Sequence, residues 1–146
     1  MDTVKKILLV EDDIDDQMFF VEAISEIKSA VLFGIANNGK EALNKLKRSV
    51  ILPDLIFTDI HMPVMNGIEC LAEIIKDPQI RNIPVVILST DKGKAKLAHV
   101  LGAKAFIEKP SDSKILREQL EHHINLNFII DSNVVNQSFP TVLSAF

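Results

Sequence analysis

The stretch Ile7-Leu8-Leu9-Val10-Glu11-Asp12-Asp13 decides the fold of this chain. Four consecutive apolar residues are followed directly by three acids. A continuous apolar run is typical of a strand that is covered on both faces, as strands are in a parallel sheet. We therefore expect a buried strand over residues 7–10, whose carboxyl end carries the acids to the edge of the sheet.

The same pattern recurs along the chain, with helical patterns between the apolar runs. Buried strands are expected over residues 55–57 and 85–88, and weaker strands over 31–36 and 104–108. Helices are expected over residues 14–28, 39–47, 66–76, 94–101 and 112–124. A strand-helix unit repeated five times predicts an α/β fold of the doubly wound (βα)5 type, a parallel sheet with helices on both faces. Ligands in such folds bind at the carboxyl ends of the strands.

Capping residues and apolar spacing support these helices. Asn38 fits the start of the second helix, Gly102 the end of the fourth, and Ser111 or Asp112 the start of the fifth. The buried stripe of the first helix is predicted from apolar residues at intervals of three: Met18, Val21, Ile24 and Ile27. The buried stripe of the fifth helix is predicted to be Leu116, Leu120 and Ile124.

Length and composition exclude several classes of protein. The chain has 146 residues, which is the length of one domain with a substantial core. Its 16 basic and 20 acidic residues give a net charge of −4, so direct DNA binding is not expected. The single cysteine, Cys70, cannot form an internal disulfide, which favours a cytoplasmic location. The apolar runs are too short to cross a membrane, and the start of the chain does not resemble a signal peptide.

Polar residues follow four of the expected strands and should meet in one crevice. Glu11 and Asp12 follow the first strand, Asp59 the third, Ser89 the fourth and Lys109 the fifth. Carboxylates this close repel one another unless a cation lies between them, and a set of oxygen ligands suits Mg²⁺. A metal, a lysine and a hydroxyl around one carboxylate form a receptor for a phosphoryl group, with Asp59 as the nucleophile.

Asp15 and Asp16 have a simpler expected role. They follow the acidic run in the first turn of the first helix. Carboxylates there interact favourably with the positive end of the helix dipole. We therefore expect these side chains to stabilise the helix terminus rather than to belong to the crevice.

The motifs together resemble the CheY-like receiver domain of two-component response regulators. The resemblance rests on residues 8–13, 53–63, 66–67, 84–89 and 102–103, and on 108–110. It covers residues 5–124 and implies a five-stranded parallel sheet in the order 2-1-3-4-5. The domain is therefore expected to span residues 1–124, with an apolar tail over residues 125–146 and no effector domain.

The resemblance also implies the ligands of the metal. Asp59 matches the phosphoacceptor of the family. Asp12 matches the direct Mg²⁺ ligand, and Glu11 matches an acid that acts through water. The backbone carbonyl of His61 matches the third protein ligand, so the side chain of His61 is not expected to bind the metal.

Three further residues match the switch of the family. Lys109 matches the lysine that binds the phosphoryl group. Ser89 matches the hydroxyl that moves toward it, and Phe106 matches the aromatic residue that changes rotamer in response. The implied output is a changed protein-interaction surface on the helix at 94–101, the strand at 104–108 and the helix at 112–124.

The implied function is that of a single-domain response regulator. A histidine kinase or a histidine phosphotransfer protein would supply the phosphoryl group, and a downstream protein would read the changed surface. Phosphorylation would bias an existing equilibrium between two states. The chain would be a signalling switch with intrinsic self-phosphorylation and autodephosphorylation activity rather than a dedicated enzyme.

Two other functions are compatible with parts of the sequence. A constitutive, phosphorylation-independent interaction module would not need the complete set of acids, Ser89 and Lys109. A phosphohydrolase of the haloacid dehalogenase type would carry a second Asp two residues after the nucleophile, where this chain has His61.

Two segments depart from the family pattern. The 20-residue interval from Ser89 to Lys109 is short for the family, and the loss falls near residues 91–94, in the expected output surface. The 22-residue tail, 125–146, is apolar and contains a single charged residue, Asp131. It is expected either to dock on its own domain or to contact a partner, and a homodimer could form through the tail or through the face between the fourth and fifth helices.

Overall fold

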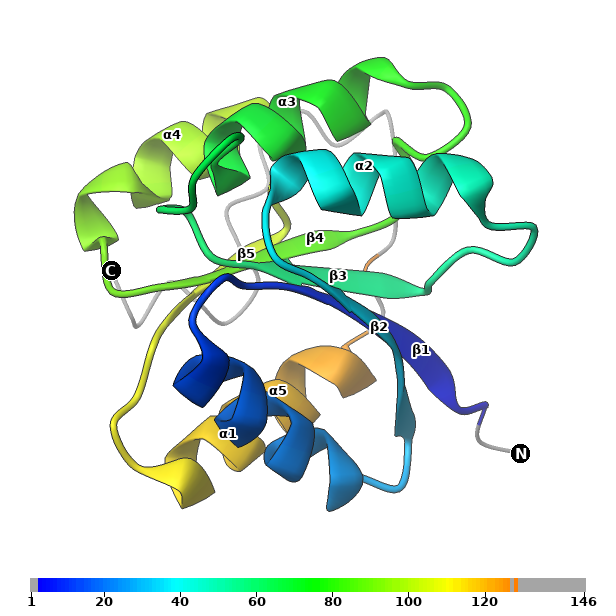
Figure 1. The fold of residues 1–146 in the computed structure, drawn as a ribbon. Coiled ribbons are helices and arrows are strands. Elements are labelled where there is room, and N and C mark those ends of the chain that lie inside the picture. Colours follow the sequence, from blue (N-terminus) through cyan, green and yellow to red (C-terminus); the bar gives the residue numbers. More distant parts are fainter. Residues whose placement is uncertain (1–2, 127, 129–146) are drawn as a thin grey trace.

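Five parallel strands form one sheet, with helices on both of its faces (Figure 1). The structure is a computed structural model that describes residues 3–126 and 128. The strand order is β2-β1-β3-β4-β5. This confirms the predicted doubly wound fold and the strand order implied by the family resemblance. Helices α1 and α5 cover one face of the sheet, and α2, α3 and α4 cover the other (Figure 1).

The elements alternate along the chain as the sequence predicts, with small shifts at their ends. The strands are β1 (Lys5–Val10), β2 (Ala30–Ala36), β3 (Leu55–Thr58), β4 (Val85–Ser89) and β5 (Ala105–Glu108). The helices are α1 (Ile14–Ser25), α2 (Gly39–Arg48), α3 (Gly67–Lys76), α4 (Ala95–Leu101) and α5 (Ser113–Asn125), with a 3-10 turn η1 (Lys92–Lys94) directly before α4.

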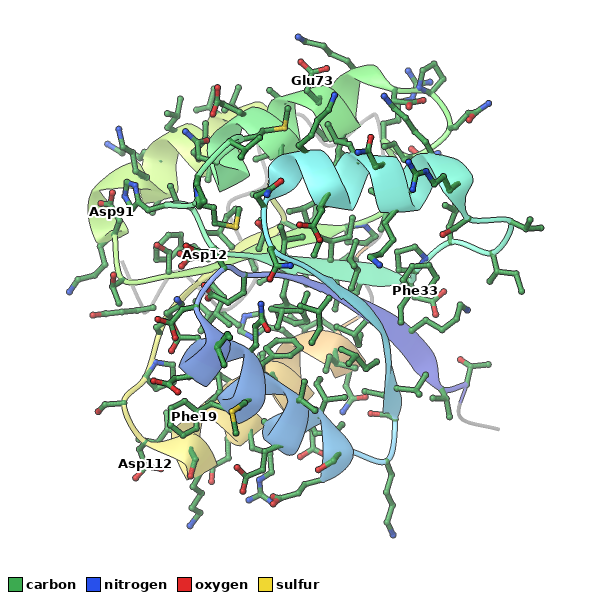
Figure 2. All side chains as sticks on the ribbon, viewed as in Figure 1. Asp12, Phe19, Phe33, Glu73, Asp91 and Asp112 are labelled. Carbon is green, nitrogen blue, oxygen red and sulfur yellow. The ribbon has the colours of Figure 1, made fainter. Side chains whose placement is uncertain are left out.

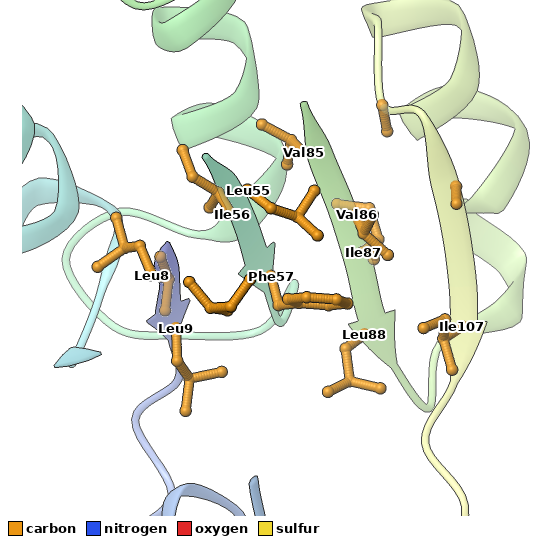
Figure 3. Packing of buried hydrophobic residues seen from close by; sticks show 14 of the residues in the cluster. Leu8, Leu9, Leu55, Ile56, Phe57, Val85, Val86, Ile87, Leu88 and Ile107 are labelled. Carbon is orange, nitrogen blue, oxygen red and sulfur yellow. The ribbon is translucent and has the colours of Figure 1, made fainter. Parts of the chain in front are cut away.

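The central strands are buried along almost their whole length. Every residue of β3 and β4 is buried, as are the last four residues of β1. Their register aligns Leu9 with Phe57 and Phe57 with Val86, so side chains of three strands pack in one layer (Figure 3). This explains why these segments are continuously apolar in sequence, because both of their faces are covered by helices.

The predicted buried stripe of α1 is confirmed at Ile24 and Ile27, which are buried, and is wrong at Met18 and Val21. Met18 is 64% exposed and Val21 is 37% exposed, whereas Phe20 and Ala23 are buried. The prediction used intervals of three residues, but each such step falls about 60° short of a full helical turn. A stripe read at that interval therefore cannot follow the core face along the whole helix, and the buried stripe of α1 begins at Phe20.

The end of α1 also differs from the prediction. The helix ends at Ser25 rather than at Lys28. The N–H groups of Glu26 and Ile27 donate to carbonyls three residues earlier, at 3.1 and 3.0 Å. Bonds of this kind tighten and close a final turn. Ile27 is still buried, so its apolar character reflects the core although it lies outside the helix.

The predicted caps are found at the helix ends. Asn38 accepts the N–H of a residue in the first turn of α2, and Asp112 rather than Ser111 does so at α5. Asn66 and Glu69 form a reciprocal capping box at the start of α3. Gly102 ends α4 with φ of 114°, a left-handed conformation that glycine adopts without strain.

The short segment after β4 forms a compact connection. Residues 92–94 make the turn η1, which runs directly into the seven-residue helix α4. The N-cap of α4, Lys94, makes no side-chain capping bond. Leu97 and Val100 are 44% and 80% exposed on this helix. The segment that the sequence predicts to be short for the family, near residues 91–94, corresponds to η1 and the residues beside it, and the shortening itself stays a prediction.

The predicted stripe of α5, Leu116, Leu120 and Ile124, is buried. The ammonium of Lys5 donates to the carbonyls of Ile124 and Leu126 and ties the end of α5 to the start of β1. Of the predicted tail, residues 125, 126 and 128 are described, and Phe128 packs against the core. The predictions on docking or dimerisation of the tail otherwise lie outside the described residues.

None of the helices between residues 3 and 126 is long and apolar enough to cross a membrane.

Candidate functional site

The candidate site lies at the carboxyl ends of the strands, where the sequence places it. The sheet ladder continues past the last strand residues and fixes the backbone there. The N–H of Glu11 donates to the carbonyl of Ala36 at 2.9 Å, and the N–H of Asp59 donates to the carbonyl of Val10 at 3.0 Å. The N–H of Lys109 donates to the carbonyl of Ser89 at 3.0 Å. These bonds hold the three side chains on one edge of the sheet.

An acidic cluster at this edge has the geometry of a cation site. Glu11, Asp12 and Asp59 each offer a carboxylate oxygen, and these oxygens lie within 4.8 Å of one another. Asp12 is exposed, at the edge of the sheet where the strands end (Figure 2). Burial raises the pKa of the Glu11 carboxyl to about 7, and repulsion by Asp59 adds to this against the opposing effect of Lys109.

The donor set fits a hard divalent cation. All three donors are carboxylate oxygens, which Mg²⁺ prefers over the softer ligands of zinc and copper sites. The buried carboxylate of Glu11 and that of Asp59 share one ammonium, that of Lys109, and the carboxylate of Asp12 lies beside them. A cation among these carboxylates would supply further positive charge.

Lys109 is the central positive charge of the site. Its ammonium lies 2.7 Å from Glu11 Oε1, 2.7 Å from Asp16 Oδ2 and 2.8 Å from Asp59 Oδ2. Burial by itself lowers the pKa of Lys109, but hydrogen bonds to the three carboxylates outweigh it and hold that pKa above its usual value. Lys109 is therefore a permanent cation that links the first, third and fifth strands through Glu11 and Asp59.

Asp16 is a further partner of Lys109 that the sequence did not indicate. It was expected to interact only with the positive end of α1, where its backbone N–H is capped by Asp13 Oδ1 at 2.9 Å. Its side chain instead reaches Lys109. The spacing of Asp16 and Phe20, four residues apart on α1, is the signal that could have found it, because both lie on the face that turns toward the sheet.

The carboxylate of Asp59 is held at both oxygens and still reachable. Its Oδ1 accepts the N–H of Ile60 at 2.7 Å, and its Oδ2 accepts from Lys109. The side chain is 13% exposed. The loop that follows is pinned by the N–H of Gly67, which donates to the carbonyl of Ile60 at 2.7 Å. A Cβ at Gly67 would lie 1.9 Å from the carbonyl oxygen of Asp59, so only glycine fits.

A chain of contacts connects the loops after β3 and β4. Ser89 is buried, and its hydroxyl accepts the N–H of Asp91 at 3.1 Å. The carboxylate of Asp91 lies 2.7 Å from His61 Nε2, and this contact holds the pKa of Asp91 below its usual value. His61 is exposed, as expected, but its side chain bridges to the neighbouring loop. Asp91 lies at the same edge of the molecule as Asp12 (Figure 2).

A sequence model of the response regulator receiver domain matches residues 7–121. The chain belongs to this family. Its curated relatives include the protein-glutamate methylesterase/protein-glutamine glutaminase of Bacillus subtilis, which is 39% identical over 112 residues. That match covers 74% of this chain but 30% of the relative, so the chain spans about a third of that protein's length. Chemotaxis protein CheY1 of Helicobacter pylori is 30% identical over 124 residues, which are 84% of this chain and 98% of CheY1.

Solved structures of receiver proteins share the fold. The phosphorylated cyanobacterial phytochrome response regulator RcpA is 30% identical, with a TM-score of 0.73 over 83% of this chain and 91% of RcpA. The Mn²⁺-bound form of response regulator Rcp1 is 28% identical, with a TM-score of 0.71 over 81% of this chain and 90% of Rcp1. The resemblance read from the sequence is therefore confirmed, and two-component signalling follows from it.

The receiver brings most of the predicted residues together. Glu11 and Asp59 meet at Lys109, and Asp12 completes the acidic cluster. Ser89 is the last residue of β4, and Asp91 lies in the loop that follows it.

Phe106 is buried in β5 and is paired in register with Ile87 of β4. Its rotamer change, the metal role of the His61 carbonyl and the phosphoacceptor role of Asp59 stay predictions.

Proposed function

We propose that this receiver accepts a phosphoryl group on Asp59, with Mg²⁺ as cofactor, and that this changes a protein-interaction surface. Membership of the family implies phosphorylation-based switching. The observation that carries the proposal is the contact of Lys109 with both Asp59 and Glu11, beside the cluster formed with Asp12. The proposal is supported by a reachable carboxylate that contacts a fixed cation and belongs to a candidate cation site.

The proposed step is an in-line transfer from a phosphohistidine of a histidine kinase or a phosphotransfer protein. A carboxylate oxygen of Asp59 forms a bond to phosphorus while the bond from phosphorus to the imidazole nitrogen breaks. The electron pair of the broken bond stays with the imidazole. With acetyl phosphate as donor, the phosphorus–oxygen bond breaks and acetate leaves. The Lys109 ammonium stabilises the negative charge of the equatorial oxygens.

Glu11, Asp12 and Asp59 would hold the cation, with the backbone carbonyl of His61 as a further ligand. When bound, Mg²⁺ supplies positive charge that offsets repulsion between the carboxylates and the incoming phosphoryl group. The exposure of Asp12 leaves room for the water ligands that Mg²⁺ usually retains. Glu11 is nearly fully buried and acts from beneath the site.

Ser89 and Phe106 would transmit the change. The Ser89 hydroxyl accepts the N–H of Asp91, so its movement toward the phosphoryl group would pull on that contact. This movement would disturb the loop that leads into η1 and α4. Leu97 and Val100 are exposed on α4. The proposed output surface is therefore formed by α4, β5 and α5.

Incubation with acetyl phosphate and Mg²⁺, followed by intact mass measurement, tests the proposal. Wild type should gain the mass of one phosphoryl group, and chelation of Mg²⁺ should prevent it. Asp59→Asn should gain nothing, whereas the control Asp15→Asn, at an exposed position, should behave as wild type. No adduct in wild type with either acetyl phosphate or a phosphohistidine protein would contradict the proposal and favour a constitutive interaction module.

A further inference from the structure

The ammonium of Lys109 is surrounded by carboxylates in the resting protein: it donates hydrogen bonds to Asp16 and Asp59 and forms an ion pair with Glu11. A lysine ammonium has three N–H donors and no acceptor. Three carboxylates surround it at 2.7, 2.7 and 2.8 Å, from Glu11, Asp16 and Asp59. A phosphoryl oxygen that approaches Lys109 must therefore compete with these carboxylates for the ammonium.

The three carboxylates differ in how readily they can be replaced. The Glu11 side chain is 3% exposed, and the Asp59 side chain is 13% exposed and is itself the phosphoacceptor. The Asp16 side chain is 40% exposed. A carboxylate that loses its partner is penalised least where water can hydrate it. Asp16 is therefore the partner that Lys109 can release at the smallest loss of free energy.

The surroundings of Asp16 favour this exchange. A cavity of about 260 Å³ lies between α1 and the start of α5, and Asp16 and Lys109 are among its lining residues. The backbone N–H of Asp16 is capped by Asp13, so α1 remains anchored when the side chain of Asp16 is released. Asp16 and Lys109 can thus separate without loss of the helix start.

We propose that Asp16 is a positioning residue that holds Lys109 in the resting receiver and gives way to a phosphoryl oxygen. This inference rests on the proposed function, because it concerns the same lysine and the same transfer to Asp59. Through Asp16, α1 would help to determine how readily Lys109 binds the phosphoryl donor. Asp16 competes with the phosphoryl group for one N–H of the ammonium.

The test compares Asp16→Asn with Asp15→Asn. Both variants remove one negative charge from the first turn of α1, but of these two aspartates it is Asp16 that forms an ion pair with Lys109. The rate of adduct formation is measured by intact mass over a range of acetyl phosphate concentrations at saturating Mg²⁺. Asp16→Asn should show an apparent affinity for acetyl phosphate about three-fold higher than Asp15→Asn, the effect expected for one partly exposed ion pair. The rate at saturating donor should change less.

Asp16→Ala serves as a second variant, and the urea unfolding midpoint shows whether each variant is folded. A purely structural role of Asp16 would shift that midpoint without changing the apparent affinity for the donor. Equal donor affinity in the folded Asp16 and Asp15 variants would overturn the inference, as would weaker affinity in both Asp16 variants. If those results appear while wild type is phosphorylated and Asp59→Asn is not, the inference alone fails. If wild type forms no adduct, the proposed function fails, and this inference fails with it.

Discussion

Replacement of Gly67 by alanine should damage the fold and the site together. Gly67 is the first residue of α3, and its backbone lies directly against that of Asp59. A Cβ placed there would be 1.9 Å from the carbonyl oxygen of Asp59 and 2.9 Å from its carbonyl carbon. Both neighbours are backbone atoms, so no side-chain rotation can relieve the clash.

The size of the effect follows from these distances. Ordinary contacts of a Cβ begin at 3.4 Å, so the two backbones must separate by about 1.5 Å. Overpacking of this kind destabilises a protein by about 1–3 kcal/mol. The hydrogen bond from the Gly67 N–H to the Ile60 carbonyl would be lost as well, which adds about 1 kcal/mol. The better helix propensity of alanine offsets about 1 kcal/mol, so a net loss of about 1–3 kcal/mol is expected.

Urea unfolding followed by circular dichroism measures the loss of stability, and intact mass measures the rate of adduct formation on Asp59. That rate should fall by about ten-fold or more, because displacement of a reacting group by an ångström is enough for such an effect. Gly34→Ala is the matched control, since a Cβ at Gly34 meets only the flexible Lys45 side chain, at 3.4 Å. A Gly67→Ala protein within about 0.5 kcal/mol of wild type would refute this reasoning.

Two further perturbations have directions fixed by the structure. Val64 is exposed and has φ of 69°, a backbone conformation that strains a β-branched residue. Val64→Asn should therefore raise the free energy of unfolding, measured by urea titration, by about 1 kcal/mol. An unchanged free energy of unfolding would contradict the strain. His123 is buried, and burial together with His122 holds its pKa below the usual value, so the folded state loses stability as pH falls below about 6.5. His123→Leu should therefore reduce the fall in unfolding free energy between pH of about 7.5 and 5.5, and an equal fall in both proteins would show that His123 is not responsible.

The fold was predictable because its strongest signals are local. The apolar runs that became β3 and β4 are buried on both faces, and each ends at a polar residue that faces the edge of the sheet. Asn38, Gly102 and Asp112 marked helix ends through hydrogen bonds or backbone angles that those residue types favour. The order of the strands came from the family resemblance instead, because several arrangements of a repeated strand-helix unit satisfy the same local patterns.

The candidate site was predictable to the extent that strand ends determine it. Glu11, Asp59 and Lys109 follow strands directly, so the parallel sheet alone brings them to one edge. The bridge between His61 and Asp91 was not predictable in the same way, because both residues lie in loops whose paths depend on tertiary packing. An isolated histidine or aspartate in a loop carries no sequence signal for its partner.

Asp16 was missed for a different reason, which is the phase of α1. Asp15 and Asp16 have the same chemistry and are adjacent in sequence, so only their positions around the helix distinguish them. Phe20 is four residues after Asp16 and is buried, which places Asp16 above the core on the face toward Lys109. The predicted stripe, which begins at Met18, instead turns the face of Asp16 toward solvent in the first turns of the helix. The error in the apolar stripe and the omission of a site residue therefore have one cause, and the correct phase of a helix beside a strand end decides which of its acids can reach the site.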